Sequence, residues 1–273
     1  MNKAKSRVRV VPILKRKKRA RVPIPASEGK ERIALFEGDV PSPPKNAQLA
    51  YGGGALIQNA SVYTIFWSSS WSGNTNMQTL MGQVNRFFTD ILVSPLIDQL
   101  SEYNVAGHYA IGHGNLAGTT VITAGAPASG TSIDDVAIQK ALQGWINGNQ
   151  VPAATPDRLY FIYFDQGVTV TMEGGSSCSD FCGYHDAINN NIYYAIMPYP
   201  SCDGCLAGLS IVDAITGTSS HELCEAITDP VPPNGWYDQT NNMEIGDICA
   251  WTFKRVAGHN VQLEWSNQAG KCV

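Results

Sequence analysis

The chain has 273 residues, 44% of them hydrophobic, which is enough for one large domain or two small ones with a proper core. It contains no run of about 18 apolar residues, so no membrane-spanning helix is expected. The net charge of −4 conceals an asymmetry: ten of the 19 Lys and Arg lie within residues 1–21, and 9 basic residues face 23 acidic ones from residue 23 onward. A basic tail therefore precedes an acidic body.

Residues 1–48 are expected to form a disordered tail, which is basic at first and then rich in proline and serine. A single domain is expected over residues 49–273. The basic cluster at residues 15–21 has the charge to contact nucleic acid. A solubilising arm explains it more simply, so nucleic acid is not an expected partner. No secretory signal is visible, because the apolar stretch Val8–Leu14 is short and is interrupted by Arg9 and Pro12.

Hydrophobic periodicity places the next elements in chain order. Residues 60–67 are β-branched and aromatic, which predicts a buried strand. Residues 77–103 have helical spacing of their apolar positions, with a break near Pro95. Short strands are expected at 108–111 and 119–122, a helix at 134–147 capped from Thr131 or Ser132, and strands at 159–164, 192–197 and 261–265. Strands that alternate with helices predict an α/β fold, with a largely parallel mixed sheet and flanking helices.

The most informative stretch is 219–230, which predicts a helix that ends before Pro230. In such a helix His221 and Glu225 share one face, because they are four residues apart. Leu223 lies about 200° round the axis from His221. We therefore expect the helix to bury its apolar side and to present the imidazole and the carboxylate to a cleft.

This helix resembles that of a metallopeptidase, with one change. The usual His-Glu-x-x-His motif supplies two imidazoles for zinc and a glutamate as general base. Here Glu225 replaces the second imidazole, and zinc also accepts carboxylate oxygen. His221 and Glu225 would then bind the metal, and Glu222 would activate the metal-bound water. The motif alone is weak, and an ordinary charged helix face explains it equally well.

A catalytic zinc also needs a third protein ligand and an open position. Glu244 is the first candidate and Asp247 the second, in the place of the downstream glutamate of the thermolysin-like peptidases. Asp229 is a further candidate. His185 is a candidate ligand or oxyanion stabiliser, held in a turn after Cys182, although a lone histidine is more often structural. A carboxylate-rich set would also suit Ca²⁺ or Mn²⁺ in a structural role.

The cysteines lie between residues 178 and 272, in a pattern typical of exported proteins. The spacing of the first four, at 178, 182, 202 and 205, suits either a structural zinc site or disulfides. Cys249 and Cys272 flank the last strand and can pair with each other. Cys224 is then left as the odd thiol, which we expect to be buried.

Several further stretches occur in a recognisable order: Tyr51–Leu56, Phe181–His185, Ser220–Glu225 with Asp229-Pro230, Gly235–Tyr237 and Glu244–Cys249. Together they resemble the phosphate-induced protein family, also called EXORDIUM-like, over most of residues 49–273. The plant members are extracellular, cell-wall-associated proteins. The resemblance therefore implies an extracellular or cell-envelope location, and disulfides rather than a zinc cage for the cysteines.

The sequence as a whole predicts a zincin-like domain with a disulfide-stapled C-terminal part. The predicted function is that of a zinc-dependent hydrolase, most simply a monomeric peptidase that acts on a peptide or cell-wall substrate. The alternative is a non-enzymatic extracellular protein that binds carbohydrate or signals, with a structural metal or none. In that case the contacts would be exposed aromatic side chains: Trp67, Trp71, Trp236, Tyr237 and Trp251.

Overall fold

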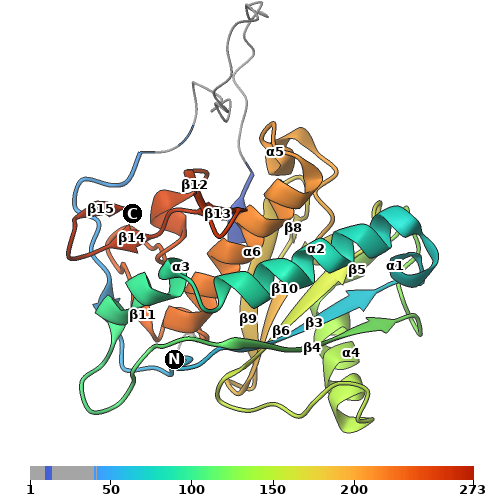
Figure 1. The fold of residues 1–273 in the computed structure, drawn as a ribbon, viewed down its shortest axis with the longest axis horizontal. Helices are drawn as coiled ribbons and strands as arrows, with labels where there is room; N and C mark the ends of the chain where they lie inside the picture. Colours follow the sequence, from blue (N-terminus) through green and yellow to red (C-terminus); the bar gives the residue numbers. More distant parts are fainter. Residues whose placement is uncertain (1–9, 14–39, 41) are drawn as a thin grey trace, which may run out of the picture.

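The computed structural model describes residues 10–13, 40 and 42–273. A six-stranded sheet lies at its centre, with the strand order β1-β9-β10-β6-β3-β4 (Figure 1). Its strands are β1 (Val10–Pro12), β3 (Ser61–Trp67), β4 (Asn115–Ile122), β6 (Arg158–Phe164), β9 (Phe181–Ile188) and β10 (Ile192–Met197). β10, β6, β3 and β4 run parallel, whereas β9 is antiparallel to β10 and β1 to β9. The predicted α/β class and mixed sheet are confirmed.

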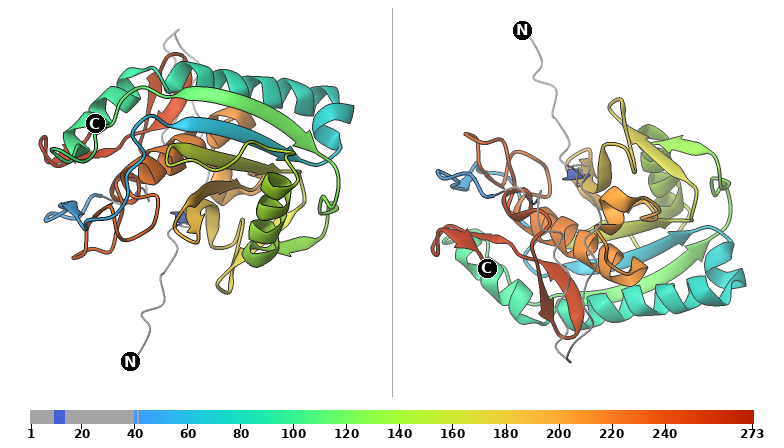
Figure 2. Two further views of the ribbon diagram at one scale, coloured as in Figure 1. Left: turned by 90° about the horizontal axis from the view of Figure 1, so that it is seen from below. Right: turned by 90° about the horizontal axis from the view of Figure 1, so that it is seen from above.

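The two faces of the sheet pack against different helices, because alternate residues of a strand point to opposite faces. Along β6, Leu159, Phe161 and Tyr163 join the core beneath α2 (Thr75–Ile91) and α6 (Ile211–Thr228). The intervening Tyr160, Ile162 and Phe164 join the core beneath α4 (Asp135–Asn147). Figure 2 shows α2 and α4 on opposite sides of the sheet. The protein therefore has three layers, and β6 lies in the middle one, as its continuous apolar run predicted.

Each long helix begins at a side chain that accepts a backbone N–H bond. Asn74 caps α2 and Ser210 caps α6. The cap of α4 is Asp134, whose carboxylate accepts the N–H of Ala137. The prediction of a cap at Thr131 or Ser132 was wrong, because the chain is still extended there, in β5 (Ser132–Asp134).

Shorter elements surround the sheet. The helical ones are α1 (Ser70–Gly73), α3 (Pro95–Asp98), η1 (Gln99–Tyr103), α5 (Asp203–Leu206) and η2 (Asp247–Cys249). The strands are β2 (Ala50–Tyr51), β7 (Thr169–Met172), β8 (Gly175–Ser176), β11 (Trp236–Tyr237), β12 (Phe253–Val256), β13 (His259–Gln262), β14 (Trp265–Ser266) and β15 (Lys271–Cys272). Residues 108–111 do not form the expected strand. There the N–H groups of Ala110 and Ile111 bond side-chain oxygens of Gln58 and Asn104 instead of a neighbouring strand.

The N-terminal stretch contributes to the fold, although residues 1–48 were expected to be a tail. Val10–Pro12 forms β1 at one edge of the sheet, and Ala47 is buried. These positions correct the prediction. The basic cluster at residues 15–21 lies outside the described residues.

Three disulfides hold the C-terminal half. They join Cys178 to Cys202, Cys182 to Cys205 and Cys249 to Cys272. Cys224 is free and buried. This confirms the pairing of six cysteines, the Cys249–Cys272 bridge and the odd buried thiol, and it excludes a four-cysteine zinc cage. Disulfides of this number are typical of proteins from oxidising compartments.

The aromatic side chains proposed as a carbohydrate surface are mostly buried, which corrects that expectation. Trp67, Trp71, Tyr237 and Trp251 are at most 4% exposed and belong to the core.

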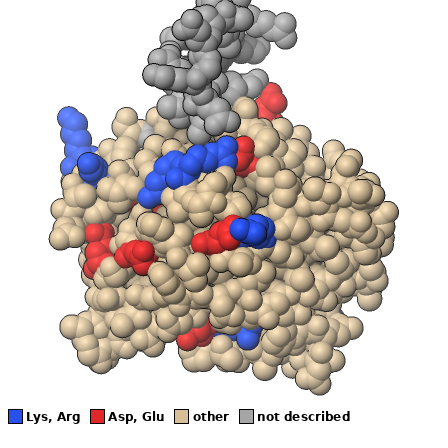
Figure 3. Space-filling model, viewed as in Figure 1, with Lys and Arg blue, Asp and Glu red and all other residues tan. Residues whose placement is uncertain are grey.

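Charged side chains are sparse on the face of the molecule shown in Figure 3. Among the described residues, no helix combines the length and the apolar character that crossing a membrane requires.

Candidate metal centre

The helix that carries the His-Glu-x-x-Glu motif is buried on all sides. α6 ends at Thr228, as predicted, and every residue from 214 to 228 is buried. The apolar residue Leu223 faces the main core, as expected. The polar side does not face an open cleft, because β13 and β9 cover it. His221, Glu222 and Glu225 are 0% exposed, so the prediction that the helix presents them to a cleft was wrong.

These side chains instead belong to a buried group of polar side chains, which we call the internal polar cluster. We use this name for His185 of β9, His221, Glu222 and Glu225 of α6, Asp229 at the end of α6, Glu244, and Asp247 of η2. All but Asp247 are 0% exposed, and the Asp247 side chain is 10% exposed. The structure therefore brings together all six residues that the sequence analysis nominated for the site, with Asp229 added from the further candidates.

His221, Glu225 and Asp247 form one group of possible ligands. One ligand atom from each lies within 4.8 Å of the other two. The Nε2 atom of His221 is 3.0 Å from Oε1 of Glu225 and 4.0 Å from Oδ1 of Asp247. Atoms that bind one zinc tetrahedrally at about 2.1 Å lie about 3.4 Å apart. The present separations bracket that value.

His185 has a different environment, because both of its ring nitrogens are bonded. Nδ1 is 3.0 Å from Oε2 of Glu222, and Nε2 is 3.1 Å from the carbonyl oxygen of Asp229. The ring lies in the middle of β9, not in a turn after Cys182, which corrects the expectation. Since neither nitrogen is free, His185 is placed to hold Glu222 and not to contact a substrate oxyanion.

Several atoms of the polar cluster are buried and have no hydrogen-bond partner among the described residues. They are Nε2 of His221, Oε1 of Glu222, Oε2 of Glu225, Oδ2 of Asp229 and both side-chain oxygens of Glu244. An unpaired buried polar atom costs about 1–3 kcal/mol, and more when it is charged. Such a concentration of unpaired oxygens in one place is the pattern expected where a cation belongs. The residues present therefore fit a metal ion.

The ionisation of the cluster supports the same conclusion. Burial raises the pKa of Asp229 to about 7, and burial together with the charges of Glu225 and Asp229 raises that of Glu244 well above its usual range. Burial alone would lower the pKa of His185, but its bond to Glu222 and the nearby carboxylates raise it to about 9. The pKa of His221 is likewise raised by Glu225 against the effect of burial. The cluster thus needs added positive charge, from protons or from a metal.

The geometry favours Asp247 over Glu244 as the third ligand, which reverses the order given by the sequence. Glu244 does not belong to the His221 group, and its Oε1 lies 3.5 Å from Nε2 of His185. A second possible group, His185 with Glu222 and Glu225, shares Glu225 with the first. His221 differs from His185 in that its Nε2 makes no hydrogen bond, although it lies 3.0 Å from Oε1 of Glu225, so the His221 group is the better candidate for a metal.

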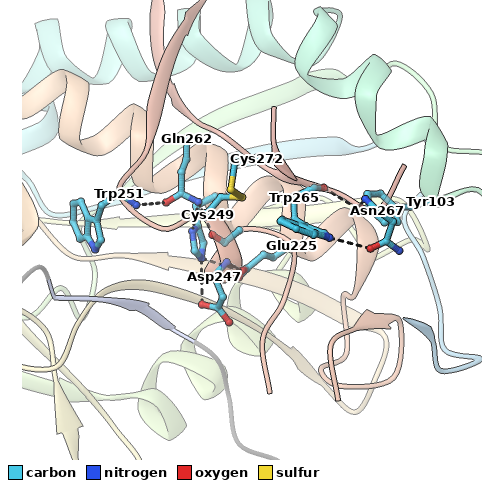
Figure 4. Close-up of a disulfide and its surroundings, with 11 residues drawn as sticks. Tyr103, Glu225, Asp247, Cys249, Trp251, Gln262, Trp265, Asn267 and Cys272 are labelled. Atoms are coloured by element: carbon cyan, nitrogen blue, oxygen red, sulfur yellow. Dashed lines mark hydrogen bonds and ion pairs between the residues drawn. A yellow bond between two sulfur atoms is a disulfide. The ribbon is translucent and has the colours of Figure 1, made fainter. Parts of the chain in front are cut away.

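The sequence analysis did not identify the residues that hold the candidate metal ligands in place. The side-chain amide of Gln262 lies 2.8 Å from Nδ1 of His221 and donates to the carbonyl oxygen of Gly246. Figure 4 shows Gln262, Glu225 and Asp247 beside the disulfide between Cys249 and Cys272. Cys249 is the last residue of η2, which begins at Asp247, so this disulfide helps to fix Asp247 opposite α6.

Replacing the support behind His221 should weaken metal binding. In Gln262→Leu, Nδ1 of His221 loses its polar partner, and the ring loses the contact that orients it. We expect the metal dissociation constant to rise about 10- to 100-fold, as for other residues that orient metal ligands. Competition with a fluorescent chelator measures the constant. Gln262→Glu is the matched control, because it keeps a polar group beside Nδ1 and replaces the amide nitrogen with an acceptor for an Nδ1–H, and it should bind no more weakly than the wild type.

Gly246 is fixed by close packing against the same ring. A Cβ atom at this position would lie 2.8 Å from Nδ1 of His221 and 3.0 Å from Oε1 of Glu225. We therefore expect Gly246→Ala to lower the free energy of unfolding by about 1–3 kcal/mol and to weaken metal binding. Denaturant melts measure the change. Gly82→Ala is the control, because a Cβ at Gly82 of α2 meets no atom within 4 Å, and it should stabilise the helix by about 0.5–1 kcal/mol.

Comparison with known proteins adds no assignment. Models of known protein families give no match to the chain, and no curated protein matches it.

Proposed function

We propose that the protein is a metal-dependent hydrolase, a zinc peptidase of zincin-like architecture, with its metal held by His221, Glu225 and Asp247. The unpaired buried atoms of the polar cluster are the observation that carries this proposal. One imidazole and two carboxylates are donors that zinc accepts, and three protein ligands leave the fourth position open. Manganese and calcium are the alternatives, since two of the three ligands are carboxylates.

Zinc at this position would lower the pKa of a bound water to about 7 and polarise a carbonyl group. Glu222 is the general base, because its Oε1 atom is unpaired and lies on the same helix as two ligands. Its other oxygen is held by Nδ1 of His185 at 3.0 Å, which fixes the direction of the free one. Glu222 can then accept a proton and pass it to the leaving amine.

A structural metal site is the second candidate, and the burial of the centre favours it. Every ligand except Asp247 is 0% exposed, as in closed structural sites. The three disulfides support an extracellular location for either candidate. An EXORDIUM-like relationship is compatible with both.

The test begins with protein freed of metal by a chelator and titrated with Zn²⁺, and follows the hydrolysis of a mixed peptide library by mass spectrometry. We expect cleavage to appear as zinc reaches one equivalent, and to be absent from Glu225→Gln, which removes one ligand charge. Binding of one zinc with no cleavage of any peptide would reject the peptidase and leave the structural site.

A further inference from the structure

The outermost strand of the sheet comes from the far N-terminus. In β1, Val10 pairs with Tyr184 and Val11 with Gly183, antiparallel to β9. The other side of β9 is paired with β10. Within the described residues, β1 is therefore the strand that satisfies the outer edge of β9.

β1 is held by side-chain contacts as well as by strand pairing. Val11 is 2% exposed and packs with Cys182, Cys205 and Trp251. The indole Nε1 of Trp251 donates a hydrogen bond of 3.0 Å to the carbonyl oxygen of Pro12. Backbone pairing together with a pocket for one side chain is how a sheet edge recognises an extended peptide.

This edge lies next to the candidate metal centre. Gly183, the partner of Val11, packs so closely on α6 that a Cβ atom there would lie 3.3 Å from Oε1 of Glu222. Tyr184, the partner of Val10, immediately precedes His185. A peptide in the position of β1 would therefore pair with the residue that packs against Oε1 of the proposed base.

The sequence after β1 offers a way to release it. Five consecutive basic residues, Lys15–Arg19, follow Pro12 after two apolar residues. Trypsin-like proteases cut after such residues. A cut there would separate β1 from residues 20–273, so that its noncovalent contacts alone would hold it.

We propose that the outer edge of β9 is a binding site for an extended apolar peptide, and that β1 occupies this site in cis. The proposal rests on the proposed function only in identifying that peptide as the substrate. While β1 is attached, it competes at an effective concentration of about millimolar, so a free peptide binds poorly.

The first test uses the full chain with Val11→Asp, which places a carboxylate in the Val11 pocket. We expect amide hydrogen exchange over residues 181–185 to accelerate about tenfold. A labelled peptide with the sequence of residues 8–14 should bind about tenfold more tightly than it does to the wild type. The control is Val136→Asp, because Val136 is 75% exposed on α4, and it should change neither quantity. Unchanged exchange and unchanged binding in Val11→Asp would overturn the proposal.

The second test keeps every wild-type side chain in the domain. Limited trypsin treatment of the full chain should release the N-terminal fragment on gel filtration, and the nicked protein should then bind the labelled peptide. A nicked protein that loses the fragment and still refuses the peptide would overturn the proposal. Both tests measure binding without turnover or metal, so they can succeed even if the proposed hydrolase activity fails.

Discussion

Glu222→Gln is expected to lower kcat/KM for a peptide substrate about 1,000-fold while the metal content stays at one ion per chain. The amide has nearly the same shape as the carboxylate, and its oxygen can still accept the hydrogen bond from Nδ1 of His185. It cannot take a proton from water at neutral pH. Kinetics of a cleaved library peptide measure the first effect, and elemental analysis of the same sample measures the second.

The control for this variant is Glu173→Gln, a change of the same type at an exposed position outside the polar cluster. It should leave both quantities unchanged. If Glu222→Gln kept its activity, Glu222 would not be the base. If it lost the metal together with the activity, Glu222 would be a ligand, as in the second group with His185.

Removal of the metal from the wild type should lower Tm by about 10 °C. A metal present at about 1,000 times its dissociation constant contributes about 4 kcal/mol, and each kcal/mol shifts Tm by about 2–4 °C in a domain of this size. The physical reason is that the buried carboxylates lose their counter-charge. Differential scanning calorimetry with and without chelator measures the shift. The Tm of Glu225→Gln should change little when the chelator is added, because this variant has lost one of the three metal-binding side chains.

The lowering of Tm on metal removal should become larger as the pH rises from 5 to 9. The folded-state pKa is raised for both Asp229, to about 7, and His185, to about 9. Each raised group contributes stability that is present at low pH and is lost as the pH rises through its folded-state pKa. The metal-free protein should therefore weaken between about pH 4 and pH 9, whereas a bound metal replaces those protons. A shift that shrinks with rising pH would contradict this.

Long apolar segments and the end of α6 could be predicted from the sequence. The continuous run in β6 identified the middle of the sheet, and the end of α6 followed from the proline after Asp229. The pairing of His221 with Glu225 followed from helix geometry alone, which places residues i and i+4 on one face. Such features depend on residues that are close together in the chain, so they can be predicted from local sequence patterns.

The supporting residues depended on contacts between distant segments. His185 lies in β9, where Cys182, Gly183 and Asp186 interrupt the apolar alternation that signals a strand. Polar residues near the C-terminus, such as Gln262 and Glu264, would ordinarily face solvent, yet both are at most 2% exposed. Gln262 is buried because β13 packs against α6, which no local pattern indicates. The docking of β1 on β9 could not be predicted either, because it too joins segments that are distant in the sequence.

Elemental analysis of protein purified without chelator is the most direct test of a cation among these buried carboxylates. We predict one zinc per chain in the wild type and none in a variant that combines His221→Ala with Glu225→Gln. A folded wild-type protein that carries no metal, and that binds none when Zn²⁺, Mn²⁺ or Ca²⁺ is added at neutral pH, would contradict the metal centre.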